Sequence, residues 1–411
     1  MSFLARFPAL QVMRHGLFAR YCLARFLITI AWQMMDVAVG WLVYALTHDP
    51  LALGLVGLSQ FLPFVSLVLV GGFVADHADR RHVLLVTYSI ECICISTLFV
   101  LTLLHNTHVL PIYACIAVFG ATRAFWAPTA QAIIPHLVPK QEFQKAIAIN
   151  AVLWQVAIIA GPALGGLLFL VSDSTVFGTC TGLFVVSLTL LAFVKVRARP
   201  DAVVEGSVQR RFLEGLRFVF RQPVVLGCTS LDLFAVLLGG ATALLPIFAG
   251  DILKAGPTGL GLLRSGPGLG ASLTAGLLAL WPITRHAGRW LFGGVAAFGC
   301  ATIVFGLSRN LWLSWLTLVA LGSVDMFSVY VRQMVVQMNT PDEIRGRVSA
   351  VTAMFVGASN ELGEFESGAM ARWLGTVPSV VAGGCATLVV VGAWMRLFPQ
   401  LRRLDRMQKT V

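Results

Sequence analysis

Residues 72–81 read GFVADHADRR and stand between two long apolar runs. Gly72 allows two helices to approach closely because it has no side chain. Asp76 can face the positive N-terminal end of a neighbouring helix, and Arg80 and Arg81 offer planar sets of donors that fit carboxylates. The stretch therefore predicts a network of polar contacts at a turn between two helices, with an ordinary basic loop as the alternative.

The apolar runs on either side of this loop are two of twelve along the chain. A helix needs about 20 apolar residues to span a bilayer, and the candidate runs lie near 21–46, 51–75, 83–104, 109–135, 146–170, 176–194, 224–250, 257–282, 290–307, 311–338, 348–374 and 378–396. Apolar residues make up 57% of the 411 residues and charged residues only 12%, whereas soluble domains carry about 25% charged residues. This composition excludes an ordinary soluble enzyme and a disordered chain. It predicts an all-α membrane protein with twelve transmembrane helices.

The net charge of +11 is spread over short clusters between the apolar runs. A nucleic-acid-binding domain gathers its basic residues on one face, so we expect no nucleic-acid partner. If the N-terminus is inside, 23 of the 30 Lys and Arg residues fall in inner segments and two in outer loops. Basic residues favour the cytoplasmic side, so both termini are expected in the cytoplasm.

The longest polar segment divides the runs into six and six. We expect an N-terminal half at 1–194, a cytoplasmic linker with an amphipathic helix at 195–222, and a C-terminal half at 223–411. A faint internal repeat supports two halves, because Gln131 and its surroundings match Gln333 and its surroundings. Two six-helix halves are the architecture of the major facilitator fold.

The linker contains RRFLEGLRFVFRQP at 210–223. On a helix, Phe212, Leu216 and Phe220 lie on one side, and Arg217 is among the basic residues that flank it. This pattern is typical of a helix that lies at a membrane surface, so membrane lipid is an expected partner. A bare linker is the alternative.

The loop at 72–81 resembles GxxxDxxGRR, the cytoplasmic loop signature of the major facilitator superfamily. In that family the loop latches the cytoplasmic side in the outward-facing state. The usual glycine of the signature is Asp79 here. Because Asp tolerates left-handed backbone better than most residues, we expect the turn to survive.

A second stretch, GPALGG, resembles the GPxxGG motif of antiporters in the same superfamily. Its residues are Gly161, Pro162, Gly165 and Gly166. Proline bends a helix and the glycines allow close contact with another helix. In the family this packing closes the periplasmic side and is associated with export, whereas helix packing without directional meaning is the alternative.

Two further stretches, RAFWAPTAQAIIP at 123–135 and IRGRV at 344–348, resemble the bacterial exporter branch that includes the enterobactin exporter. The resemblance covers the whole chain. It implies a monomeric, proton-coupled exporter of a drug or siderophore-like molecule, working by alternating access in the bacterial inner membrane. The expected partners are a small-molecule substrate and protons, with no cofactor. The alternatives are an importer or facilitator on the same fold and a lipid-modifying membrane enzyme, but the sequence supplies no convincing nucleophile and base for an enzyme.

Ionisable side chains at membrane depth are costly, so each is a candidate functional residue. The acids in the predicted spans are Asp36, Glu91, Asp232, Asp325, Glu361, Glu364 and Glu366. The deep bases are Arg25, Arg123, Arg264 and Arg332. The resemblance implies that Asp36 is protonatable and that Arg123 lies beside a proton site; the alternative for both is a structural salt bridge.

The sharpest local chemistry lies in the eleventh run, where Glu361 and Glu364 are about 60° apart around a helix. Glu366 points elsewhere. Two carboxylates in a low dielectric cannot both stay ionised without a cation. The pair therefore predicts a site for a proton, a cationic substrate or a metal, and the alternative is an interdomain lock onto Arg332 or Arg264. We take as site candidates Asp36, Arg123, Asp232, Asp325, Arg332, Glu361 and Glu364. The histidines lie mainly in predicted loops, so no metal site is expected.

Overall fold

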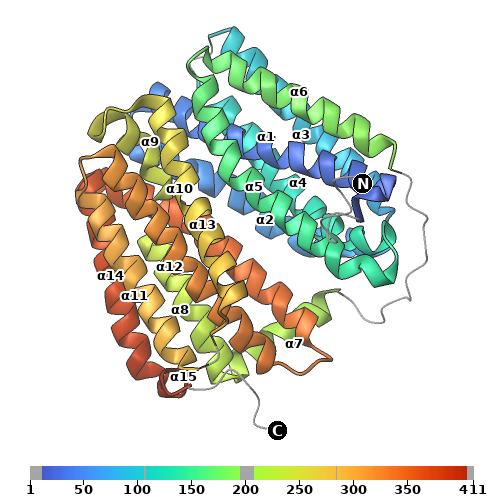
Figure 1. Ribbon diagram of the computed structural model, residues 1–411. Coiled ribbons are helices and arrows are strands. Elements are labelled where there is room, and N and C mark those ends of the chain that lie inside the picture. The colour runs from blue at the N-terminus through green and yellow to red at the C-terminus, as the bar shows by residue number, and fades with distance from the viewer. Residues whose placement is uncertain (1–11, 106–107, 195–207, 284, 405–411) are drawn as a thin grey trace. The chain divides into compact units, whose positions relative to one another are not determined.

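The computed structural model describes residues 12–105, 108–194, 208–283 and 285–404, and it is built of helices (Figure 1). The chain forms two compact units, Met1–Leu46 with Ser59–Glu205 and Thr47–Leu58 with Gly206–Val411. The main helices of the first unit are α1 (Gly16–Thr47), α2 (Pro50–His77, whose first residues group with the second unit), α3 (Arg80–Leu103), α4 (Leu110–Ala132), α5 (Phe143–Leu168) and α6 (Asp173–Ala192). Two short 3₁₀ turns, η3 (Ile134–His136) and η4 (Lys140–Glu142), join α4 to α5.

The second unit begins with a short helix and continues with long ones. Its elements are α7 (Val208–Arg221), α8 (Pro223–Gly239), η5 (Thr242–Leu244), α9 (Leu245–Ile247), η6 (Phe248–Ile252), α10 (Gly256–Leu280), α11 (Ala287–Leu307), α12 (Leu311–Met338), α13 (Arg345–Leu374), α14 (Thr376–Leu397) and α15 (Pro399–Arg402).

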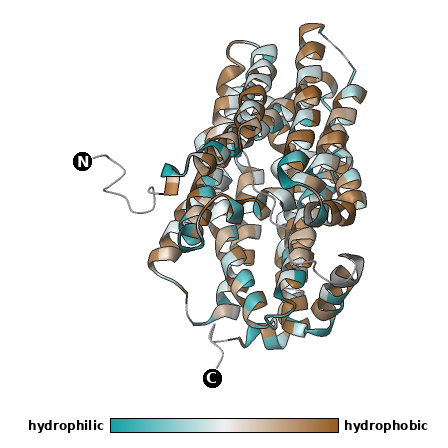
Figure 2. Ribbon diagram, turned by 90° about the vertical axis from the view of Figure 1, so that its right-hand side faces the viewer, coloured by the Kyte–Doolittle hydropathy of each residue, from teal (hydrophilic) through white to brown (hydrophobic). Residues whose placement is uncertain are grey.

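Ten helical segments among the described residues are long and apolar enough to cross a membrane. Apolar residues run along their length (Figure 2). Two long helices, α10 and α13, are not among the ten. The first is rich in glycine and contains Arg264, and the second carries three glutamates. The fold is therefore that of an all-α, multi-pass membrane protein.

The predicted run at 224–250 is not one continuous helix. It is a regular α-helix only as far as Gly239, and the chain then passes through a 3₁₀ turn, a short α turn and a π turn that ends at Ile252. Two successive glycines, Gly239 and Gly240, weaken a helix at this point, and Pro246 has no N–H to continue the backbone ladder. Hydropathy does not register such a break, because the residues on both sides of it are apolar.

Glycines set the close packing of the first unit. A Cβ added at Gly71 of α2 would lie 2.0 Å from the carbonyl oxygen of Ala124 on α4. A Cβ added at Gly120 of α4 would lie 2.0 Å from the carbonyl oxygen of Gln60 on α2. No side chain fits at such distances, so α2 and α4 meet backbone to backbone, as small residues permit in membrane helices.

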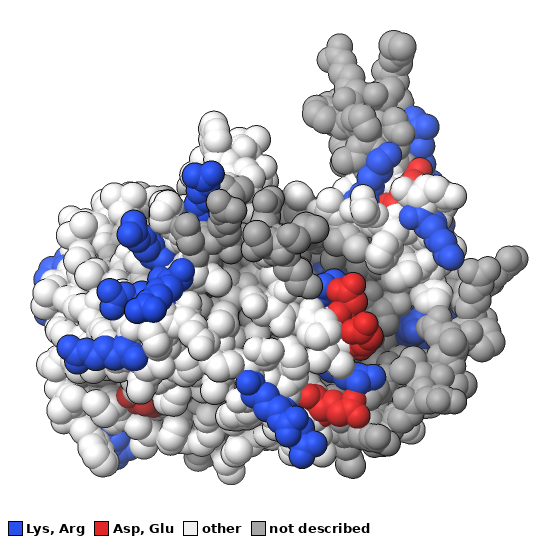
Figure 3. All heavy atoms as spheres, turned by 90° about the horizontal axis from the view of Figure 1, so that it is seen from below, with Lys and Arg blue, Asp and Glu red and all other residues white. Residues whose placement is uncertain are grey.

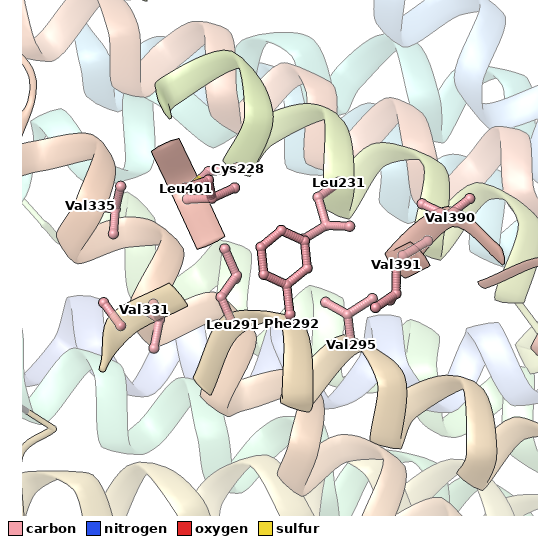
Figure 4. Close-up of a cluster of buried hydrophobic side chains, with 12 residues drawn as sticks. Cys228, Leu231, Leu291, Phe292, Val295, Val331, Val335, Val390, Val391 and Leu401 are labelled. Carbon is pink, nitrogen blue, oxygen red and sulfur yellow. The ribbon is translucent and has the colours of Figure 1, made fainter. Parts of the chain in front are cut away.

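The second unit has a well-packed apolar core where α8, α11, α12, α14 and α15 meet (Figure 4). Leu231 of α8 and Phe292 of α11 lie at its centre, with Val331 of α12 and Val390 of α14 around them. At one end, Leu401 of the short α15 completes the cluster and is fully buried. The core therefore ties the last helix of the unit to its first long one.

The same end of this unit is basic. The start of α11 packs against α15, since a Cβ at Gly288 would lie 2.3 Å from the carbonyl oxygen of Leu401. Arg289, Arg396 and Arg402 are exposed around this contact, and Figure 3 shows Lys and Arg side chains gathered on this face.

The stretch predicted to form an amphipathic helix is helical as α7 and packs on the second unit through part of its apolar side. Phe212, Leu216 and Val219 pack with residues of α8 and α13, whereas Leu213 and Phe220 are each 60% exposed. Glu214 of α7 forms an ion pair with Arg347 of α13. The helix is therefore docked on the second unit through one face and presents a second apolar face outward. The side chain of Arg210 lies outside the described residues.

Candidate functional site

The most completely enclosed carboxylate of the first unit is Glu91 of α3, which has no exposed surface. Trp32 of α1 donates its indole Nε1–H to Oε2 of Glu91 at 2.9 Å. Thr122 of α4 donates its hydroxyl to Oε1 at 2.6 Å. One carboxylate thus joins three helices, and each of its oxygens accepts a hydrogen bond.

Aromatic rings surround this carboxylate. The indole of Trp32 stacks on that of Trp126, with ring centroids 4.2 Å apart and planes at 22°. Tyr88 of α3 meets Trp32 edge to face at 5.8 Å, and Phe184 of α6 does so at 6.4 Å. Trp32 and Trp126 pack on each other and, with these rings, enclose Glu91, which has no exposed surface.

The two candidates of the first unit lie on the helices that hold Glu91. Asp36 follows Trp32 by one turn of α1, and its side chain is exposed. Arg123 follows Thr122 on α4, and its guanidinium lies over the ring of Phe64, 5.1 Å from the centroid. The hydrogen bonds of Glu91 therefore hold α1 and α4, the helices that carry Asp36 and Arg123, against α3.

The GPxxGG stretch packs α5 against α1. A Cβ added at Gly161 would lie 2.4 Å from Cβ of Gln33, the residue after Trp32. A Cβ at Gly165 would lie 3.0 Å from Cα of Met34. Pro162 and Gly166 are buried in the same helix. The motif thus brings a second helix onto the part of α1 that carries Trp32 and Asp36.

The arginines of the first loop motif bind within the first unit. Arg80 contacts the ring of His136 in the α4–α5 connection. Arg81 donates to the carbonyl oxygen of Ala192, the last residue of α6. A cation at the C-terminal end of a helix satisfies free carbonyl groups and the helix dipole. The two arginines therefore tie the motif loop to two other segments, the α4–α5 connection and the end of α6.

Asp79 does not adopt the left-handed backbone that we expected. Its φ is −62°, and its carboxylate accepts from the backbone N–H of Arg81 at 2.8 Å and of His82 at 3.2 Å. It is the N-cap of α3, a role that favours Asp. Desolvation opposes ionisation, but these backbone donors and the side chain of His82 together outweigh it and hold the pKa of Asp79 below its usual value. Gly72 is half-buried, and the side chain of Asp76 lies outside the described residues.

In the second unit, Asp232 of α8 forms an ion pair with Arg332 of α12, and both side chains are buried. Arg332 is thus neutralised inside the core by a residue of another helix. Asp325 lies two turns before Arg332 on α12 and is half-buried. Both residues were predicted as site candidates, but their ion pair was not predicted from the sequence.

Glu361 and Glu364 lie where α13 meets the first turns of α2. Glu361 is 6% exposed. A Cβ added at Gly57 would lie 2.8 Å from Oε2 of Glu364, so this carboxylate rests against the backbone of α2. Between the two glutamates, Gly363 packs on the carbonyl oxygen of Val236 in α8.

Sequence reasoning flagged Glu91 as an acid at membrane depth but did not include it among the site candidates. Its two donors lie 59 and 31 residues away, in other helices. Within the described part of the chain, no group of three or more His, Cys, Asp and Glu side chains is arranged to hold a metal ion.

The chain is similar to known membrane transporters in sequence and in fold. The family model described as transmembrane secretion effector matches residues 8–410. The chain is 27% identical to the enterobactin exporter EntS of Escherichia coli over 399 residues, covering 95% of this chain and 93% of that protein. It is 25% identical to the multidrug efflux pump Tap of Mycolicibacterium fortuitum over 388 residues, covering 91% and 93%. Among solved structures, the nucleoside transporter NupG matches with a TM-score of 0.77 at 13% identity, covering 93% of this chain and 100% of that one.

Proposed function

The chain belongs to the transmembrane secretion effector family of the major facilitator superfamily, whose members are transporters and not enzymes, and from this premise we propose that it is a proton-coupled exporter. The proposed cargo is a small organic molecule of the drug or siderophore class, as the names of Tap and EntS suggest. The proposed topology has twelve spans, namely the ten apolar segments together with α10 and α13. Both termini are placed in the cytoplasm of a bacterial cell, with the protein working as a monomer in the inner membrane.

The observation that carries this proposal is the packing of the GPxxGG stretch on α1. Gly161 and Gly165 lie against Gln33 and Met34, and Asp36 follows on the same helix. An exposed acid on a membrane helix is a functional candidate because the bilayer penalises its charge. We assign proton exchange to Asp36, with Arg123 favouring its ionised form when the two sites approach in the transport cycle.

The remaining candidates take supporting roles in this proposal. Glu361 and Glu364 bind a proton or a cationic group of the substrate, and Asp325 is a further acid of the same half. Asp232 and Arg332 form a fixed pair within it. Gly72, Asp76, Arg80 and Arg81 form the latch that closes the cytoplasmic side. One proton moving across the membrane supplies about 2.3 kcal/mol per 100 mV, so no nucleotide is required.

Transport of a fluorescent dye tests the proposal directly. The full-length protein is reconstituted in lipid vesicles, a pH gradient is imposed, and the movement of ethidium is followed. We expect concentrative ethidium transport that stops when an uncoupler collapses the gradient, and that is lost in Asp36→Asn. If ethidium only equilibrates across the membrane, whether or not a pH gradient is present, the protein is a facilitator. If ethidium accumulates in the direction in which protons move, the protein is an importer.

A further inference from the structure

Glu91 is a buried acid to which the proposed transport cycle assigns no role. Its partners are neutral, because the indole N–H of Trp32 and the hydroxyl of Thr122 donate to its two oxygens, and the further side chain in hydrogen-bonding reach is the indole of Trp126. Within the part of the chain that the structure describes, no Lys or Arg forms an ion pair with it. A buried carboxylate without a cation is costly to keep ionised. Glu91 can therefore bind a proton without leaving a charge uncompensated.

The groups that face this carboxylate come from each helix packed around it. On α3 they are Tyr88 and Cys94, which both interact electrostatically with Glu91. On α1 they include Arg25, which interacts with Tyr88 and whose guanidinium lies 5.2 Å from the centroid of the Trp154 ring. From α4 comes Cys115, a neighbour of Cys94, and from α6 the ring of Phe184.

The hydroxyl of Thr122 has two acceptors within reach. It lies 2.6 Å from Oε1 of Glu91 and 3.0 Å from the carbonyl oxygen of Phe119 in its own helix. A hydroxyl carries one hydrogen and can also accept, whereas an indole N–H can only donate. Among the described side chains that bond to Glu91, therefore, Thr122 can reverse its hydrogen bond without any helix moving, whereas the indoles cannot.

We propose that Glu91 is a second proton-binding site of the first unit, in which Oε1 takes up a proton as the Thr122 hydroxyl turns from Glu91 to Phe119. In the ionised state, Trp32 and Thr122 each donate to one carboxylate oxygen. When a proton arrives, an O–H bond forms at Oε1 and the net charge of Glu91 falls from minus one to zero. That O–H donates to the Thr122 oxygen, whose own hydrogen now points to the Phe119 carbonyl, and Trp32 keeps its bond to Oε2. Every polar group has a partner in both states.

The site lies beside the helices that carry the assigned proton exchange. Trp32 is one turn before Asp36 on α1, and Thr122 is the residue before Arg123 on α4. The role of Glu91 in transport rests on the proposed function, whereas the titration of Glu91 does not. A proton on Glu91 removes a charge from the point where α1, α3 and α4 meet, and so alters the electrostatic field at both assigned residues.

Infrared difference spectroscopy between acidic and alkaline pH tests the proposal on the full-length protein without any substrate. We expect a protonated-carboxyl C=O band that titrates reversibly in wild type and is missing from Glu91→Gln. In Thr122→Val the ionised form loses a charge-assisted bond and the neutral form a weaker one, so the midpoint should rise by roughly one pH unit. Thr122→Ser should keep the wild-type midpoint. The matched control is Thr97→Val, since the hydroxyl of Thr97 is exposed and donates only within α3, to Ile93.

Two results would overturn the proposal: an unchanged band in Glu91→Gln, or a Thr122→Val midpoint equal to that of Thr97→Val. If Glu91→Gln does not fold, Trp32→Phe takes its place, because loss of the indole donor should also raise the midpoint. Ethidium transport with and without an uncoupler separates this inference from the proposed function. Coupled transport without Glu91 titration removes only the inference, whereas Glu91 titration with uncoupled transport removes only the proposed function.

Discussion

Two buried carboxylates, one in each unit, have opposite surroundings. Glu91 of the first unit accepts from a neutral indole and a neutral hydroxyl. Asp232 of the second unit is paired with the guanidinium of Arg332. A proton on Asp232 would leave a buried cation uncompensated, whereas a proton on Glu91 removes a buried charge. The same kind of residue at membrane depth is therefore suited to a fixed structural pair in one unit and to a proton site in the other.

The largest expected effect comes from breaking the fixed pair. Arg332→Met leaves Asp232 buried without its cation, and we expect the free energy of unfolding to fall by about 3–5 kcal/mol. The double variant with Asp232→Asn should recover most of that loss, because no uncompensated charge remains. Unfolding followed in detergent measures both. A single variant as stable as wild type would show that the pair is not what holds α8 and α12 together.

Removing the indole donor of Glu91 should have the next largest effect, and it should depend on pH. Trp32→Phe keeps most of the ring packing but deletes the hydrogen bond to Oε2, which costs about 1.5–3 kcal/mol for a charged acceptor. The loss should shrink in acid, where a neutral Glu91 binds the donor less strongly. The control is Trp312→Phe, since that side chain is 63% exposed on α12. A loss that does not vary with pH contradicts the contrast between the two carboxylates.

A substitution in the GPxxGG stretch tests the packing of α5 on α1 and leaves the second unit unchanged. Gly161→Ala places a methyl group 2.4 Å from Cβ of Gln33, and overpacking of this kind costs about 1–3 kcal/mol. Gly182→Ala in α6 is the matched control, because nothing lies within 4 Å of a Cβ there. We expect only the first variant to lower the thermal midpoint and to slow ethidium transport. Equal behaviour of the two would argue against close packing at the GPxxGG stretch.

The smallest expected loss of stability concerns Asp79, an exposed carboxylate. Asp79 caps α3, and Asp79→Ala should cost about 1 kcal/mol near neutral pH. Because folding lowers the pKa of Asp79, its ionised form contributes stability above the unfolded value of about 3.9. That contribution is lost as the pH falls through the lower folded value. Asp79→Asn should retain the cap and lose this acid dependence, which unfolding curves at about pH 3 and 7 would reveal.

Much of the fold follows from patterns that act along the chain. Apart from the run at 224–250, the predicted runs coincide with long helices, because continuous apolar stretches of this length have few alternatives in a membrane. The break after Gly239 escaped prediction because hydropathy stays high through it. Phe212, Leu216 and Phe220 were predicted to share the apolar side of a surface helix. The structure packs Phe212 and Leu216 on a cluster that includes Val351 of α13 and leaves Phe220 exposed, a contact that the pattern of α7 alone does not specify.

The candidate site was less predictable because its geometry joins distant segments. The cost of ionisable residues in a bilayer was enough to flag Glu91, Asp232 and Arg332. It did not reveal that Arg332 would meet Asp232, or that Trp32 and Thr122 would converge on Glu91. Such partners depend on helix rotation and depth, and close contacts such as that of Gly161 with Gln33 fix these only in three dimensions.

The most direct test of the account is the pH dependence of ethidium transport in two variants measured side by side. One is Glu91→Gln, and the other is the double variant Asp232→Asn with Arg332→Met. We predict that the first flattens or displaces the pH profile, because Gln cannot exchange a proton, while the second keeps the wild-type midpoint even if its rate falls. A wild-type midpoint in Glu91→Gln together with a displaced one in the double variant would contradict the account, since the pair of Asp232 and Arg332, and not Glu91, would then respond to protons.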